Sequence, residues 1–100
     1  MRLDVSKLPV DRIERFCREH RIRRLALFGS ALREDFTPES DLDVLVEFEL
    51  GTRVGWAFFG MQRELSEILG RNVDLNTPGF LSDHFRDQVL AEAKDLYVAA

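Results

Sequence analysis

Residues 25–48 read LALFGSALREDFTPESDLDVLVEF, and the fold follows from this stretch. The apolar run at residues 25–28 predicts a strand, and Gly29 and Ser30 interrupt it. Glycine has no Cβ, so the backbone can turn sharply there and approach a ligand closely. If a helical turn follows at Ala31, its unpaired N–H groups point toward Ser30. The Gly-Ser break therefore predicts a turn that cradles phosphate groups.

A second strand is predicted over residues 42–48, and two acids stand at its start. Side chains alternate between the two faces of a strand. One face would carry Leu42, Val44, Val46 and Phe48, and the other Asp41, Asp43, Leu45 and Glu47. Two carboxylates that point the same way repel each other unless a cation or a proton lies between them. A divalent metal explains the pair economically, and Mg²⁺ prefers oxygen ligands.

A third acid lies in a short strand predicted at residues 72–75, which read NVDL. Asp74 stands between Val73 and Leu75, so its side chain should point away from these two apolar neighbours. In that orientation it could join Asp41 and Asp43. The alternative is an exposed acid on an edge strand.

The rest of the chain predicts helices and one further strand. Apolar residues recur at helical spacing over residues 9–20, 54–69 and 81–93, and residues 96–98 could add a short edge strand. The expected fold class is α/β, a small mixed sheet with helices packed on one face and the carboxylate-bearing face left open. Trp56 and Phe59 fall off the apolar stripe of their helix. They predict an interface with a partner or a second copy, unless neighbouring loops cover them.

Composition limits the possible functions. The 100 residues predict a single domain spanning residues 1–100, and the formal net charge of -4 argues against nucleic-acid binding through bulk electrostatics. The single cysteine, Cys17, permits no intramolecular disulfide and lies on an apolar helix stripe, which predicts a buried core residue. No apolar run is long enough to span a membrane, and no signal peptide is evident, so we expect a cytoplasmic protein.

Two motifs at a defined spacing carry a family resemblance. Gly29-Ser30-Ala31-Leu32-Arg33 is followed by Ser40-Asp41-Leu42-Asp43, with eleven residues from Ser30 to Asp41. This pattern resembles the nucleotidyltransferase superfamily that includes DNA polymerase beta. It is most similar to the minimal nucleotidyltransferases (MNT) that pair with HEPN-domain toxins. The segment VDLNTPGFLSDHFRDQVLAEA at residues 73–93 is also similar to the end of MNT proteins.

The predicted chemistry is metal-dependent nucleotidyl transfer. Asp41, Asp43 and Asp74 would be the catalytic residues and would hold two Mg²⁺ ions, which stabilise the entering and leaving oxygens of an in-line displacement. Gly29 and Ser30 would hold the β- and γ-phosphates of the triphosphate. An acceptor hydroxyl would attack the α-phosphorus, and Asp74 could take its proton.

Two further residues are candidate nucleotide-binding residues. Arg33 would lie near the triphosphate or at a partner surface, or else pair with a neighbouring acid. Ser40 would bond a strand-end amide or orient Asp41.

The resemblance implies a particular biological role. It implies a type VII-like antitoxin that transfers AMP from ATP to a tyrosine of its cognate HEPN ribonuclease toxin and so silences it. The first alternative is an antitoxin that neutralises its HEPN toxin by binding alone. The second is a stand-alone transferase that modifies a small molecule or a nucleic-acid end. A homodimer is also possible.

Overall fold

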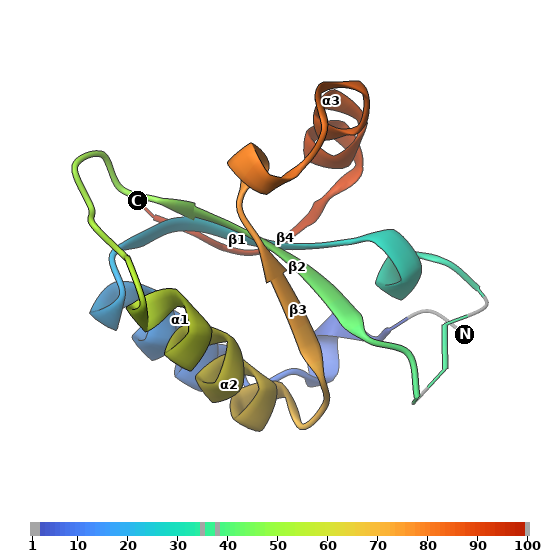
Figure 1. Cartoon of the computed structure of the whole chain (residues 1–100). Coiled ribbons are helices and arrows are strands. Elements are labelled where there is room, and N and C mark those ends of the chain that lie inside the picture. Colours follow the sequence, from blue (N-terminus) through green and yellow to red (C-terminus); the bar gives the residue numbers. More distant parts are fainter. Residues whose placement is uncertain (1–2, 35, 38, 100) are drawn as a thin grey trace.

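The part of the chain that the structure describes folds into a four-stranded mixed sheet flanked by three helices (Figure 1). The computed structural model describes residues 3–34, 36–37 and 39–99. The strands, in the spatial order β3-β2-β1-β4, are β1 (Ile22–Phe28), β2 (Leu42–Phe48), β3 (Val73–Asn76) and β4 (Lys94–Val98). The helices are α1 (Val10–Glu19), α2 (Ala57–Leu69) and α3 (Asp83–Glu92), with short 3₁₀ turns at Val5–Lys7, Gly29–Leu32 and Pro78–Phe80.

The sheet is mixed, with both antiparallel and parallel strand pairs. Strand β1 pairs antiparallel with β2 and with β4, whereas β2 and β3 pair in parallel. Parallel neighbours cannot be joined by a hairpin and need a crossover, and α2 supplies it between β2 and β3. The predicted terminal strand is confirmed as the edge strand β4.

Helices α1 and α2 cover one face of the sheet, as predicted (Figure 1). Alternate residues of β1 and β2, among them Leu25, Leu27 and Val44, are fully buried against these helices. Apolar side chains of the two helices complete this core, namely Ile13, Phe16, Cys17, Met61 and Leu65. The members of this core follow the expected alternation along β2 and β3 and the expected stripe along each helix.

Helix α3 differs from the prediction because it lies on the opposite face of the sheet (Figure 1). A second, smaller core forms there from Phe28, Leu45 and Val89. The alternation that places Asp43 on this face also places Leu45 there, two residues further along β2. The mixed α/β class is therefore confirmed, but α3 covers part of the carboxylate-bearing face.

The helix ends follow local backbone geometry. Helix α2 begins at Ala57, three residues later than predicted, because Gly55 adopts a φ of 54° that no right-handed helix contains. The predicted stop is confirmed, since Gly70 caps the helix in the left-handed conformation. None of the helices in the described residues is both long and apolar enough to cross a lipid bilayer.

Cys17 should be unreactive while the protein is folded. Its side chain is buried, and burial, with a smaller contribution from Glu14, raises the pKa of the thiol to about 12. Because the thiolate is the reactive species, Ellman's reagent at pH 8 should label no thiol in native protein and one in urea. Rapid labelling of the native protein would show that this part of α1 opens readily.

Candidate functional site

The three predicted aspartates lie at neighbouring positions on two paired strands. Asp43 in β2 and Asp74 in β3 are direct register partners, and Asp41 immediately precedes β2. Register partners project to the same face of a sheet, so their carboxylates share the open part of the second face. Asp43 is half-buried, whereas Asp41 and Asp74 are exposed.

The Gly-Ser turn packs directly against one of these acids. Phe28 at the end of β1 is the register partner of Asp43, so the chain passes this carboxylate as it leaves the strand. Gly29 has a φ of 66°, and a Cβ at this position would lie only 2.5 Å from Asp43 Oδ2. Glycine is therefore required here both by backbone conformation and by the close approach.

Ser30 ties the same turn to the start of β2. Its hydroxyl donates a hydrogen bond of 3.2 Å to the carbonyl oxygen of Asp41. Its backbone N–H donates to the carboxylate of Asp43 and so lowers the cost of a charge there. The hydroxyl and the N–H of Ser30 thus bond to Asp41 and Asp43, two of the predicted metal-binding residues.

This arrangement affects the protonation of Asp43. Burial is the largest influence that raises its pKa above the ordinary value, and the neighbouring Asp74 and Asp41 carboxylates raise it further. The Ser30 N–H and the positive charge of Arg33 lower the pKa but do not compensate. A cation placed among these carboxylates would relieve the repulsion.

The other two predicted nucleotide-binding residues have different surroundings. Arg33 is exposed, and its positive charge lowers the pKa of Asp43. The Ser40 hydroxyl accepts a hydrogen bond of 3.1 Å from the N–H of Thr37 and lies 3.1 Å from the Thr37 hydroxyl. It stabilises the turn before β2, and the amide of Leu42 bonds instead to the carbonyl oxygen of Asn72 at 2.9 Å.

The donor set suits a hard divalent cation. Carboxylate oxygens are the ligands that Mg²⁺ prefers, and burial together with the neighbouring Asp74 and Asp41 carboxylates makes a charge on Asp43 unfavourable unless a cation offsets it. The oxygens of the three acids do not all lie within 4.8 Å of one another. Among the described residues, only Glu19, His20 and Glu64, at the α1–α2 contact, form a group that compact. The aspartates therefore fit a metal by chemistry and charge, and would have to converge on it.

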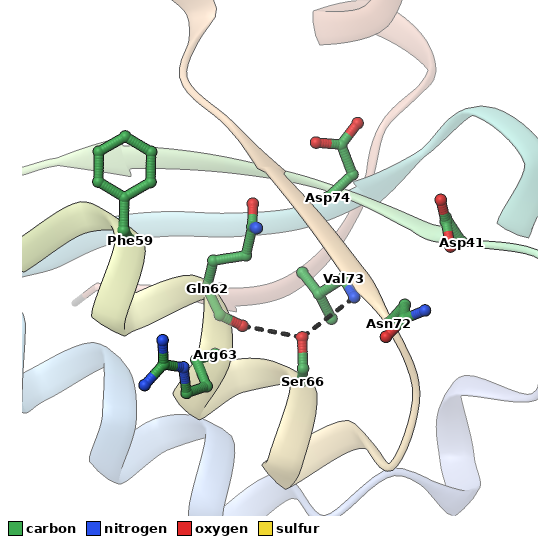
Figure 2. Close-up of a pocket in the computed structure, with 8 residues that line it drawn as sticks. All are labelled: Asp41, Phe59, Gln62, Arg63, Ser66, Asn72, Val73 and Asp74. Carbon is green, nitrogen blue, oxygen red and sulfur yellow. Dashed lines mark hydrogen bonds between the residues drawn. The ribbon is translucent and has the colours of Figure 1, made fainter.

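A hollow of about 490 Å³ opens beside two of the aspartates (Figure 2). Asp41 and Asp74 line it on one side, and α2 lines the other. Figure 2 shows the Phe59 ring and the Gln62 side chain extending from α2 toward the same side as the Asp74 carboxylate. The remaining lining residues are Arg63, Ser66, Asn72 and Val73.

Gln62 and Ser66 secure the strand that carries Asp74, and neither residue is predicted from the sequence as part of the site. Strand β3 is an edge strand, so its outward N–H groups need partners other than a strand. Gln62 Oε1 accepts from the N–H of Leu75 at 3.0 Å. Ser66 Oγ accepts from the N–H of Val73 at 3.1 Å (Figure 2). The available signal was two polar residues four apart that border the apolar stripe of α2.

Removing the Ser66 hydroxyl should loosen β3. Ser66→Ala leaves the N–H of Val73 without its partner, which should cost about 1–2 kcal/mol in the free energy of unfolding. Hydrogen exchange at the Val73 amide should accelerate, as measured by NMR. Ser66→Thr keeps the hydroxyl and serves as the matched control. Equal exchange in both variants would mean that β3 does not depend on this bond.

A second, smaller hollow of about 240 Å³ lies beyond the Gly-Ser turn. Gly29 and Arg33 line it together with Phe85, Gln88 and Val89 of α3. The larger hollow beside α2 thus contains two of the aspartates, whereas the smaller one beside α3 contains Gly29, which packs against Asp43.

Comparison with known proteins identifies the relatives of this chain by sequence and by fold. Residues 10–96 match the family model described as a nucleotidyltransferase domain. A Methanocaldococcus jannaschii protein called "putative protein adenylyltransferase" is 35% identical over 78 residues, which are 78% of this chain and 83% of that protein. A solved structure called "putative minimal nucleotidyltransferase" superposes with a TM-score of 0.73 at 32% identity, over 91% of this chain and 94% of that one.

Two toxin–antitoxin structures share the fold at lower identity. One, a toxin–antitoxin with AMP-PNP, has a TM-score of 0.71 at 24% identity over 92% of this chain and 75% of that one. The other contains a tri-AMPylated HEPN toxin of Shewanella oneidensis with its MNT antitoxin, and has a TM-score of 0.57 at 23% identity over 90% of this chain and 70% of that one. With a family model that matches most of its length and a relative of more than 30% identity, this chain belongs to the nucleotidyltransferase domain family and is a nucleotidyltransferase.

Proposed function

We propose that this chain transfers AMP from ATP to a tyrosine hydroxyl of a HEPN-domain ribonuclease toxin and thereby acts as its antitoxin. The main support is the register that pairs Asp43 with Asp74, beside Asp41 and against the Gly-Ser turn. Similarity to proteins named as adenylyltransferases and to MNT antitoxins supports the choice of AMP and of a protein acceptor.

The carboxylates have distinct proposed roles. Asp41, Asp43 and Asp74 would hold Mg²⁺, which when bound neutralises charge on the phosphates and acidifies the acceptor hydroxyl. Asp74, which is exposed and lines the larger hollow, would accept the proton of the acceptor hydroxyl. The acceptor oxygen would form a bond to the α-phosphorus, and the bond from that phosphorus to the bridging oxygen would break to release pyrophosphate.

The Gly-Ser turn and Arg33 would hold the triphosphate. Gly29 brings bare backbone close to the aspartates, and Ser30 fixes the turn on Asp41 and Asp43. Arg33 contributes the positive charge nearest to this turn in sequence, and phosphate oxygens match its planar guanidinium. We propose that residues 1–100 form one domain and that the reaction takes place in the cytoplasm.

Intact mass spectrometry tests this function directly. The protein would be mixed with ATP, Mg²⁺ and the HEPN-domain protein encoded beside its gene, with Asp43→Asn run in parallel. We expect one or more AMP additions on the partner, absent with the variant, and tandem fragmentation should locate them on a tyrosine. A stable complex without added mass would instead support neutralisation by binding. The absence of both, or of a neighbouring HEPN gene, would count against the toxin partner.

A further inference from the structure

Two hollows, one lined by Asp41 and Asp74 and one lined by Gly29 of the Gly-Ser turn, offer separate places for the two substrates of a transfer reaction. The smaller one contains Gly29 and Arg33, two of the residues proposed to hold the triphosphate. The larger one contains Asp41 and Asp74 but no residue of the Gly-Ser turn. A nucleotide held on the Gly-Ser turn therefore leaves the larger hollow for the acceptor.

Large aromatic side chains border the larger hollow and are open to solvent. Trp56 is 86% exposed and Phe59 is 63% exposed. Their ring centroids lie 6.0 Å apart, and Phe58 meets Phe59 edge to face at 6.2 Å from the partly buried side. Phe59 itself lines the hollow, so the aromatic pair is continuous with the site that holds Asp74 (Figure 2).

We propose that this acceptor surface, formed by Trp56, Phe59, Gln62 and Arg63, docks the segment of the partner protein that carries the acceptor hydroxyl. The inference rests on the proposed transferase function. Exposed tryptophan and phenylalanine beside an arginine are the side chains most enriched at protein interfaces. A hollow of about 490 Å³ is large enough for one side chain with its flanking backbone.

The charges of the hollow favour a protein segment over a nucleic acid. Asp41 and Asp74 line it, and Arg63 is the single cation among its lining residues. With Arg63 as its single basic side chain, the hollow offers a phosphodiester backbone little of the electrostatic attraction that supplies most nucleic-acid affinity. A neutral tyrosine hydroxyl needs no such attraction, and its ring can pack against Phe59.

Trp56 makes this surface directly observable because it is the only tryptophan in the chain. Protein labelled with 5-fluorotryptophan should give one ¹⁹F resonance that reports on residue 56 alone. We expect the purified HEPN partner to shift or broaden it, without ATP present, and ATP with Mg²⁺ alone to leave it unchanged. An unchanged ¹⁹F resonance at saturating partner concentration would overturn the proposal. A shift that depends only on the concentration of this protein would also overturn it, because it would indicate that a second copy occupies the surface.

Kinetics then separate docking from chemistry. Trp56→Ala and Phe59→Ala should each raise the KM for the HEPN partner at least about tenfold and leave the KM for ATP unchanged. Val98→Ala is the matched control, because Val98 is 58% exposed on β4, at the opposite edge of the sheet from β3. Unchanged partner KM in both aromatic variants, or a raised KM for ATP instead, would contradict the assignment.

Failure of the inference can be told apart from failure of the proposed function. If wild-type protein transfers AMP and the aromatic variants retain the wild-type KM for the partner, the function holds and the docking surface is wrong. If no transfer occurs but the partner shifts the residue 56 resonance, the surface holds and the transferase function fails. The exposed positions of both aromatics mean that their alanine variants should fold, which circular dichroism verifies.

Discussion

Asp43→Asn should lower AMP transfer more than about a hundredfold and, in metal-free buffer, raise the melting temperature. Loss of activity is expected because the replaced oxygen is a proposed metal ligand, and even residues that merely orient ligands are worth about 10–100-fold. The stability gain is expected because burial, Asp74 and Asp41 all disfavour a charge on Asp43. Asparagine removes this charge and retains an oxygen that can accept from the N–H of Ser30.

The pH dependence of stability tests whether the charge on Asp43 destabilises the folded protein. The folded-state pKa of Asp43 is raised, so its favourable contribution is complete below about pH 4 and is lost as pH rises through the folded pKa. The stabilisation by Asp43→Asn should therefore be small at acidic pH and grow toward neutrality, measured by thermal melts in EDTA. Asp87→Asn, an exposed acid on α3, removes the same charge and should show neither effect. A variant less stable than wild type at pH 7 would disprove the electrostatic account.

Gly29→Ala should cost about 2–4 kcal/mol in the free energy of unfolding, from backbone strain and a steric clash. The residue has a φ of 66°, and its new methyl group would lie 2.5 Å from Asp43 Oδ2. Either the turn or the carboxylate must move, so AMP transfer should fall sharply as well. Urea denaturation and the mass assay measure the two effects.

Gly70→Ala separates strain from the clash. Gly70 has a nearly identical φ of 70°, and a Cβ there would meet nothing within 4 Å. The free energy of unfolding of this variant should fall by only about 1–2 kcal/mol, the cost of a left-handed backbone at a residue with a Cβ, and its activity should stay at the wild-type level. Equal losses of stability in the two variants would show that the contact with Asp43 has no energetic consequence.

Much of the fold could be predicted because its signals are local. The apolar run of β1, the alternation of β2 and the glycine that ends α2 depend on neighbouring residues alone. The first residue of a helix was harder to predict where the backbone conformation of a single residue set it. Gly55 adopts a positive φ and delays the start of α2, which apolar periodicity at residues 54–69 does not reveal.

Side-chain partners across the molecule could not be predicted. The pattern identified Ser30 as a polar residue at a turn, yet its partners, Asp41 and Asp43, depend on how β2 lies beside that turn. The roles of Gln62 and Ser66 could not be predicted because both accept hydrogen bonds from backbone N–H groups of β3. Those groups need side-chain partners only because β3 lies at the edge of the sheet. Helix α3 was assigned to the wrong face because its apolar stripe does not specify which of two apolar surfaces it covers.

The sequence by itself determined which residues alternate, where the chain turns, and that Asp41, Asp43 and Asp74 could point to one face. The tertiary structure decided that β2 and β3 pair in parallel with Asp43 beside Asp74, and that α2 and β3 enclose a hollow next to them. The physical reason is that periodicity depends on the backbone geometry of a few consecutive residues. Strand register and helix placement instead depend on burying surfaces that are distant in the chain, and the raised pKa of Asp43 arises only once those surfaces have met.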